Sequence, residues 1–486
     1  AKKLEANRKS VRSDVDYVLT FEELQGMFDA KNIDFTTLEA DPEDGLPPSV
    51  LAPAAYTGGE ILVLYQDGSC ETVACQDDAA LAETLAQLSA HPDVALVQPN
   101  YTYESTALST SDPLVGEQWA LDNDGSFQLE EQENRYPVFD DPFDVPSAPW
   151  QWIAPWWMWS AGSIQVQAVA GVDIGAEDAW ALYDGGSRDV VVALVDTGID
   201  YTHEDLVGRI WTNTDEIPGN GIDDDGNGYV DDVYGWNFYS GTNDVYVGTE
   251  DAHGTHGAGT IAANAGNGVG IAGIVQSDHV KVMAVKALGG SGGSGTTASI
   301  IQAIQYAEAN GAQICNLSLG SSQNDPALYR TIASSKMLFV VAAGNDGTDL
   351  ETAPSYPASY DLDNLIAVAN IRYDGELDPT SSYGAASVDL AAPGSYILST
   401  TPGNTYSYMT GTSMAAPQVT GLTALLMQYF RETGLAEKAG VSPRVLAHSL
   451  LMSTAQPLYE EASGGYYSLL KQGAGLAKVD DALAAQ

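Results

Sequence analysis

The chain has 486 residues, 44% of them hydrophobic and 17% charged, so it has the composition of a globular protein and room for two or three domains. Its 66 Asp and Glu residues against 19 Lys and Arg residues give a net charge of −47, which argues against nucleic acid or anionic lipid as a partner. No uninterrupted apolar run reaches the length of a membrane span, so we expect no spanning helix.

Residues 1–58 differ in character from the rest of the chain. Five of the 19 basic residues fall within 1–13, after which the charge reverses. A capping-box pattern followed by spaced apolar residues predicts a short amphipathic helix near 21–31. The stretch 41–53 is rich in Pro, Gly and acidic residues, which indicates a linker.

Residues 59–104 predict a small α+β unit. The run 60–67 is typical of a strand, a helix with leucines on one face follows it, and 94–103 is typical of a second strand. Strand, helix and strand within so short a stretch indicate a separate unit. Cys70 and Cys75 lie inside this unit and could pair in an oxidising compartment.

Residues 124–171 are interpreted as an insertion, in which five of the nine tryptophans fall between Trp150 and Trp159. An exposed aromatic cluster of this kind can recognise carbohydrate, a membrane interface or a protein partner. The alternative, which we favour slightly, is that the insertion folds back as a hydrophobic plug on the neighbouring domain.

From Asp189 onward, short apolar runs alternate with helical patterns such as 299–310. The runs are rich in β-branched residues and contain little polar alternation, as expected of strands buried on both faces. They are 190–195, 280–284, 314–319, 338–343 and 365–368. This alternation predicts an α/β fold with a mostly parallel sheet flanked by helices, in which active residues lie at the carboxyl ends of strands.

Three polar side chains lie at such positions. Asp196 ends a buried strand, where a carboxylate can hold an imidazole, although Asp before a glycine turn is common without a catalytic role. His253 opens a helix with His256 three residues later; zinc helices use a four-residue spacing, so a general base at His253 and a structural role for His256 fit better. Ser413 begins a helix that runs to about 432, where the helix dipole favours developing negative charge, although serines also cap helices.

The order and surroundings of these residues resemble the subtilase family. The resemblance rests on VDTGID, HGTHGAGT and GTSMAAPQVTG, together with NLSLG at 316–320, AAGNDG at 342–347 and DLAAPG at 389–394. It runs from about Asp112 to the C-terminus and implies a subtilisin-like fold with serine endopeptidase activity. Asp196, His253 and Ser413 would then form the catalytic triad.

The same resemblance implies further site residues. Asn345 would donate its side-chain amide to the oxyanion, the alternative being a plain turn residue. Ser318, Leu319 and Gly320 would line the substrate groove and pair with an extended peptide as an added strand. Asp346 would lie at the mouth of the S1 pocket, which gives a mild expected preference for basic or polar P1 residues.

The segment NGIDDDGNGYVDD at 220–232 predicts a calcium site, and some subtilases carry a similar acidic loop for this purpose. Several of its side chains have the odd-position spacing of a calcium loop. The candidate ligands are Asp223, Asp225, Asn227, Asp231 and Asp232. The terminal Glu of an EF-hand is missing, since Tyr234 stands there, so no helix–loop–helix hand is implied. The alternative is a solvated acidic turn, but so many carboxylates would repel one another without a cation.

Two resemblances cover the N-terminal part. The unit at 59–104 resembles the inhibitory propeptide of subtilases, and cleavage is expected between Tyr103 and Asp112. Residues 1–58 resemble a fragment of the catalytic domain of iron-only hydrogenases, on AKKLEANR, DVDYVLTFEEL and KNIDFTTLEADPEDG. No cysteine precedes Cys70, so no iron–sulfur cluster can be held there, and we interpret this stretch as a remnant of gene fusion.

The sequence therefore predicts a calcium-stabilised serine endopeptidase that is made as a zymogen and acts on proteins or peptides. Residues 105–486 would form the catalytic domain, with 59–104 as an intramolecular inhibitor. Secretion is expected only from the family resemblance and the propeptide, because the sequence itself shows no signal peptide. We also expect a monomer. The alternative is a permanently inhibited protein that serves as a binding module through the tryptophan-rich insertion, against which the intact catalytic positions argue.

Overall fold

Two units make up the part of the chain that the structure describes, and the division falls between Thr106 and Ala107. The computed structural model describes residues 112–129, 163–183, 185–290, 292–460, 465–467 and 469–485, together with 56–65, 70–74, 94–101, 135–137 and residue 88. The expected helix at 21–31, the linker at 41–53 and the tryptophan cluster at 150–159 lie outside the described residues.

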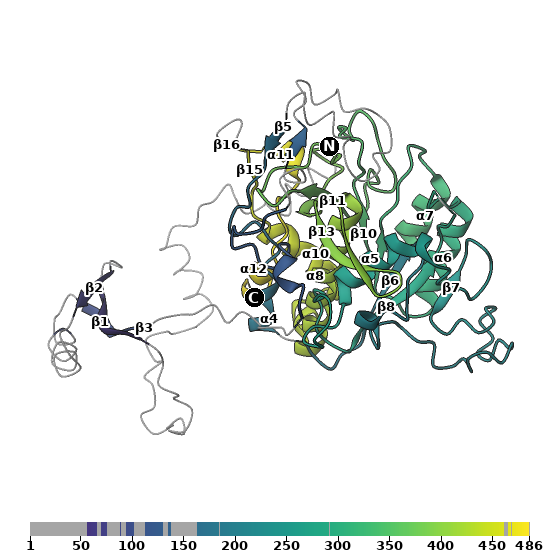
Figure 1. Ribbon diagram of the computed structural model, residues 1–486, viewed down its shortest axis with the longest axis horizontal. Coiled ribbons are helices and arrows are strands. Elements are labelled where there is room, and N and C mark those ends of the chain that lie inside the picture. The colour runs from purple at the N-terminus through teal and green to yellow at the C-terminus, as the bar shows by residue number, and fades with distance from the viewer. Residues whose placement is uncertain are drawn as a thin grey trace. The chain divides into compact units, whose positions relative to one another are not determined.

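Seven parallel strands form the central sheet of the larger unit (Figure 1). The strands are β6 (Val190–Asp196), β7 (Gly235–Asn237), β8 (Val280–Lys286), β9 (Ile314–Leu317), β10 (Leu338–Ala342), β11 (Leu365–Ile371) and β12 (Leu390–Pro393). Their spatial order is β12-β11-β10-β9-β6-β8-β7, and every neighbouring pair is parallel. The predicted α/β fold with a mostly parallel sheet is confirmed.

Helices cover both faces of this sheet. Successive side chains of each buried strand point to opposite faces, so each face presents apolar side chains that the helices bury. In β6, Val192 and Leu194 belong to one hydrophobic core, whereas Ala193 and Val195 belong to the other. The helices are α4 (Ala176–Leu182), α5 (Ala252–Ala262), α6 (Thr297–Ala309), α7 (Pro326–Ser334), α8 (Thr412–Thr433), α10 (Pro443–Thr454) and α12 (Val479–Ala484). The first core contains residues of α4, α5, α8, α10 and α12, and the second contains residues of α6 and α7.

The larger unit also contains shorter helices and strand pairs outside the central sheet. They are the helices α9 (Leu435–Ala439) and α11 (Leu469–Gln472), and the antiparallel pairs β4 (Arg135–Pro137) with β5 (Ser163–Gln165), β13 (Ile397–Thr401) with β14 (Thr405–Met409), and β15 (Tyr459–Glu460) with β16 (Gly465–Tyr466). The β4–β5 pair joins the two segments that flank residues 138–162. Among the described residues, no helix combines the length and apolarity that a bilayer crossing needs.

The start of the larger unit is tied to the loop that follows α5. Asp112 is buried, and its two carboxylate oxygens accept hydrogen bonds from Gly266 N at 2.6 Å and Gly268 N at 2.8 Å. Gln118 forms two more bonds with the backbone of Ala272, each of 2.8 Å. These four bonds fix the segment independently of the residues that precede it.

The smaller unit contains the strands β1 (Tyr56–Tyr65), β2 (Cys70–Ala74) and β3 (Val94–Tyr101) in an antiparallel sheet of order β2-β1-β3. β1 and β3 lie where the sequence predicts strands, whereas β2 was not predicted. Of the helix expected between β2 and β3, the described residue is Leu88, which is helical.

Candidate active site and acidic loop

Asp196 and His253 form a hydrogen-bonded pair at the carboxyl end of the sheet. Asp196 is the last residue of β6, and His253 is the second residue of α5. His253 Nδ1–H donates to Asp196 Oδ1 across 2.8 Å, and Thr197 N–H donates to the same oxygen at 2.6 Å. The Asp196 side chain is 2% exposed and that of His253 24% exposed, so the carboxylate is enclosed while the imidazole keeps an open edge.

The surroundings of His253 favour its protonated form. Burial opposes the charged imidazolium, but the carboxylate of Asp196 outweighs this effect and raises the pKa of His253 above its ordinary value. In the neutral ring, Nδ1–H is used by Asp196, so the lone pair lies on Nε2. This is the arrangement that a general base needs.

Two glycines let the end of β6 approach the start of α5. Gly198 has a φ of 116°, and a Cβ there would lie 2.4 Å from Val245 O and 2.6 Å from Asp251 Oδ1. A Cβ on Gly254 would lie 2.2 Å from Gly198 O. The glycines of the VDTG and HGTH segments therefore permit the close contact on which the Asp–His pair depends.

Ser413 is the second residue of α8 and is partly exposed. The helices α5 and α8 meet about one turn beyond His253 and Ser413, because a Cβ on Gly257 would lie 3.5 Å from Pro417 Cγ. His253 and Ser413 therefore stand in the first turns of two helices that pack against each other. Sequence reasoning placed both residues at helix starts, and the structure packs the two helices together one turn beyond them.

Asn345 lies in the loop after β10 and is held by α8. Its Oδ1 accepts hydrogen bonds from Thr412 N at 2.8 Å and from Thr412 Oγ1 at 3.0 Å. With the oxygen occupied in this way, the exposed side chain presents its NH₂ group beside the residue that precedes Ser413. The geometry therefore orients the amide as a hydrogen-bond donor for the site.

The predicted groove residues follow β9. Ser318 Oγ–H donates to Ser413 O at 3.1 Å, so Ser318 lies against the start of α8. Ser318 is buried, Leu319 is half-buried and Gly320 is exposed, which means that this segment runs from beside Ser413 to the surface. The predicted strand extended to Leu319, whereas β9 ends at Leu317.

His256 has the structural role expected of it. Its ring is fully buried, and Nε2–H donates to Ile397 O at 2.8 Å. Burial, with a smaller contribution from His253, lowers the pKa of His256 to about 4. His256 is therefore neutral at physiological pH and adds no positive charge beside the candidate base.

The acidic loop brings Glu216, Asp225 and Asp232 together, with one carboxylate oxygen of each lying within 4.8 Å of the others. Glu216 is 5% exposed and Asp232 0% exposed. No described lysine, arginine or histidine forms an ion pair with any of the three. Asp225 and Asp232 were predicted as ligands. Glu216 was not, since it precedes the spaced acidic pattern.

The other predicted ligands take different positions. Asn227 lies against the cluster, since its Nδ2 donates to Asp225 Oδ2 and to Asp232 Oδ2, each at 3.0 Å. Asp223 and Asp231 instead accept bonds of 2.9–3.1 Å from backbone N–H groups of the loop. The structure thus uses these two carboxylates to brace the loop backbone.

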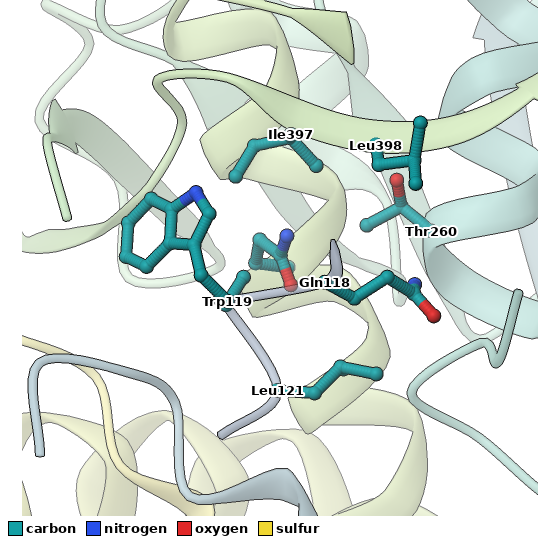
Figure 2. A pocket seen from close by; sticks show the side chains of 8 residues that line it. Gln118, Trp119, Leu121, Thr260, Ile397 and Leu398 are labelled. Atoms are coloured by element: carbon teal, nitrogen blue, oxygen red, sulfur yellow. The ribbon is translucent and has the colours of Figure 1, made fainter. Parts of the chain in front are cut away.

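A small cavity of about 10 Å³ is lined by residues of α5, β13 and α8 and by the segment 118–121 (Figure 2). Its lining residues are Gln118, Trp119, Ala120, Leu121, Thr260, Ile397, Leu398 and Gln418. The volume suits about one water molecule, which the buried and otherwise unpartnered Gln418 Oε1 could bind. The cavity is too small for a peptide.

Comparisons with known proteins agree with this geometry. Residues 187–475, more than half of the chain, match the family model described as the Subtilase family. Thermitase of Thermoactinomyces vulgaris is 36% identical over 256 residues, which span 52% of this chain and 79% of that protein. The major intracellular serine protease of Bacillus subtilis (strain 168) is 38% identical over 265 residues, spanning 54% and 75%.

Among solved structures, one described as proteases from Pseudoalteromonas arctica PAMC 21717 superposes with a TM-score of 0.51 at 26% identity. The superposed region covers 78% of this chain and 99% of the chain in that structure. Residues 1–74 match a second family model, described as the iron only hydrogenase large subunit, C-terminal domain, which confirms the resemblance at the N-terminus. This match reaches beyond 58 into β1 and β2. With its matched region spanning the sheet, the Asp–His pair and both helix starts, the chain belongs to the subtilase family and is a subtilisin-like serine protease, a hydrolase.

Proposed function

We propose that the chain is an endopeptidase whose triad is Asp196, His253 and Ser413. The observation that carries the proposal is the 2.8 Å bond from His253 Nδ1 to the enclosed Asp196 carboxylate, with Ser413 starting the helix packed against that of His253. Ser413 Oγ attacks the scissile carbonyl while His253 Nε2 takes its proton and later gives it to the leaving amine. Asp196 fixes the imidazole tautomer and stabilises the imidazolium.

The oxyanion of the tetrahedral intermediate is stabilised by Asn345 Nδ2 and by the N–H of Ser413. Support for Asn345 comes from its two bonds to Thr412, which leave its NH₂ group as the donor. Such donors act strongly because they are already oriented when the charge develops.

Substrate binds as an extended strand along Ser318, Leu319 and Gly320. The position of Ser318 supports this placement, since its hydroxyl bonds to Ser413 O and the segment leads outward from there. Asp346, exposed beside Asn345, gives the S1 entrance a negative charge, so P1 residues that are basic or polar are preferred.

The unit at 59–104 acts as an inhibitory propeptide, and cleavage between Tyr103 and Asp112 releases the active enzyme. The proposal rests on the position of this unit directly before a subtilase domain. We propose secretion and a monomeric state on the family resemblance, although the relatives include a protease named as intracellular.

Removal of the residues before Asp112, followed by treatment with a fluorophosphonate, tests the endopeptidase proposal. The probe is expected to modify Ser413, as read by mass spectrometry of the labelled peptide, because His253 activates that hydroxyl. Ser442 also stands before a helix, α10, and should remain unmodified, which provides an internal control. An unmodified Ser413 in the folded, processed protein would refute the assignment.

The acidic loop binds calcium through Glu216, Asp225 and Asp232, with Asn227 at the side of the site. The donor set fits, because calcium takes six to eight oxygen ligands and prefers carboxylates. Two of the three carboxylates are buried without a basic partner among the described residues, and a divalent cation would offset their mutual repulsion. Calcium here stabilises the loop and takes no part in catalysis.

Calcium is expected to raise the melting temperature of the processed protein, by an amount equivalent to about 2.7 kcal/mol at about 100-fold excess over Kd. In Glu216→Gln this rise should be smaller, because one buried ligand loses its charge. Asp215→Asn, which changes the exposed neighbouring carboxylate, serves as the control and should respond to calcium like the unaltered protein. Equal calcium responses in all three proteins, measured by differential scanning fluorimetry, would count against the site.

A further inference from the structure

Lys286, the last residue of β8, is a buried lysine at the candidate active site. Its side chain is 1% exposed. Its ammonium donates to Asp251 Oδ1 at 2.7 Å, to Glu250 Oε1 at 3.0 Å and to Thr197 O. All three ammonium protons therefore have an acceptor.

These acceptors belong to the two segments that carry the Asp–His pair. Thr197 directly follows Asp196, the last residue of β6. Asp251 and Glu250 stand two and three residues before His253, at the start of α5. The ammonium of Lys286 thus joins the end of the strand to the beginning of the helix, at the point where the Asp–His bond spans the same gap.

Asp251 transmits this connection to the backbone. It is fully buried, and its second oxygen accepts bonds from Val247 N at 2.6 Å and Gly248 N at 3.1 Å. Lys286 is itself anchored, since its carbonyl oxygen accepts a bond from Phe238 N at 2.7 Å. The strand, the turn before α5 and the lysine therefore form one fixed group.

A buried ammonium has a desolvation cost that an apolar side chain of similar length would not have. The ion pair is thus a poor device for general stability at this position. Its hydrogen bonds instead set the distance between the end of β6, which carries Asp196, and the start of α5, which carries His253. The bond from Lys286 lowers the pKa of Glu250, whereas burial raises the pKa of the enclosed Asp251 in spite of the same ammonium, which reflects the cost of burying this pair.

We propose that Lys286 is a positioning residue that sets the distance and orientation of His253 relative to Asp196. The proposal rests on the triad proposed above. Lys286 does not contact the reacting atoms; it acts through Thr197 and Asp251. Without it, the start of α5 is free to move from the end of β6, and the Asp196–His253 bond lengthens.

Lys286→Met, which keeps much of the side-chain volume, is expected to lower kcat by about 10- to 100-fold with KM changed little, because a small misplacement of a catalytic group has an effect of this size. The acid limb of the pH profile of kcat/KM should move to lower pH, because a more distant Asp196 raises the pKa of His253 less. Lys281→Met is the matched control on the same strand; Lys281 is only half-buried and bonds to Gly208 O, away from the Asp–His pair.

Removal of Lys286 leaves the buried Asp251 carboxylate unpaired, which could by itself unfold the protein. The double variant Lys286→Met with Asp251→Asn removes that charge and keeps a side-chain oxygen for Val247 N and Gly248 N. It should fold and still show the lowered kcat and the shifted acid limb. A double variant with the kcat and acid limb of the unaltered protein would overturn the proposal.

Fluorophosphonate labelling of the unaltered protein separates the two proposals. If Ser413 of the unaltered protein is not modified, the triad itself is wrong. If it is modified and Lys286→Met keeps the kcat and acid limb of the unaltered protein, the triad stands and the positioning role of Lys286 is wrong.

Discussion

Asp196→Asn is expected to lower kcat by about 10⁴-fold, with little change in KM. The carboxylate presents two acceptors and a negative charge to its surroundings, and His253 Nδ1–H donates to one of these acceptors at 2.8 Å. An asparagine removes the charge and can offer an N–H to the ring. The imidazole is then stabilised with its proton on Nε2, where it cannot accept the proton of Ser413.

The same substitution should move the acid limb of kcat/KM to lower pH. His253 must be neutral to act as the base, so activity is lost as the pH falls through its pKa. Asp196 raises that pKa, and the loss of its charge therefore lowers it. Asp189→Asn is a matched control, because Asp189 bonds His279 Nδ1 with the same 2.8 Å distance at an exposed site. A pH profile and kcat unaffected by Asp196→Asn would contradict the assigned role.

Asn345→Leu should lower kcat by about 10²- to 10³-fold, or ~3–4 kcal/mol in the activation free energy, with KM almost unchanged. The side chains are similar in size, but leucine offers no donor to the oxyanion. The effect falls on kcat because the donor acts on charge that develops after binding.

Thr412→Val tests whether the orientation of the amide matters. It removes the hydroxyl that bonds Asn345 Oδ1 at 3.0 Å but leaves the bond from Thr412 N, so a smaller loss of kcat is expected. Asn310→Leu, at the C-terminal end of α6, is the control for an asparagine replaced elsewhere. Steady-state kinetics with a peptide substrate check all three, and an unchanged kcat in Asn345→Leu would exclude this residue from the oxyanion site.

The central sheet could be predicted because its strands are buried on both faces and so are almost purely apolar. The run at 190–195 is an example, and the structure adds only Asp196 to it. β7 was not predicted because its three residues, Gly235–Asn237, are too few to show a pattern. The strand predicted to reach Leu319 ends at Leu317, the last residue that pairs with β10, and Ser318 beyond it donates its hydroxyl to Ser413 O.

Long-range contacts limited the prediction of the sites. Asp196, His253 and Ser413 each stand at an element end, which a local pattern reveals. Glu216 joins Asp225 and Asp232 only because the loop returns on itself, and its local sequence shows no ligand spacing. Lys286 ends a strand, a position typical of a solvated lysine, and its burial depends on acceptors from two distant segments.

The anchorage of Asp112 and Gln118 has a consequence for how the chain would respond to being cut. Their four bonds secure the N-terminal segment of the larger unit to Gly266, Gly268 and Ala272. Cleavage of the backbone before Asp112 would separate the two units and leave the N-terminal segment of the larger unit folded in place. These four bonds would already hold the new N-terminus when it forms, so proteolytic processing would not require the larger unit to refold.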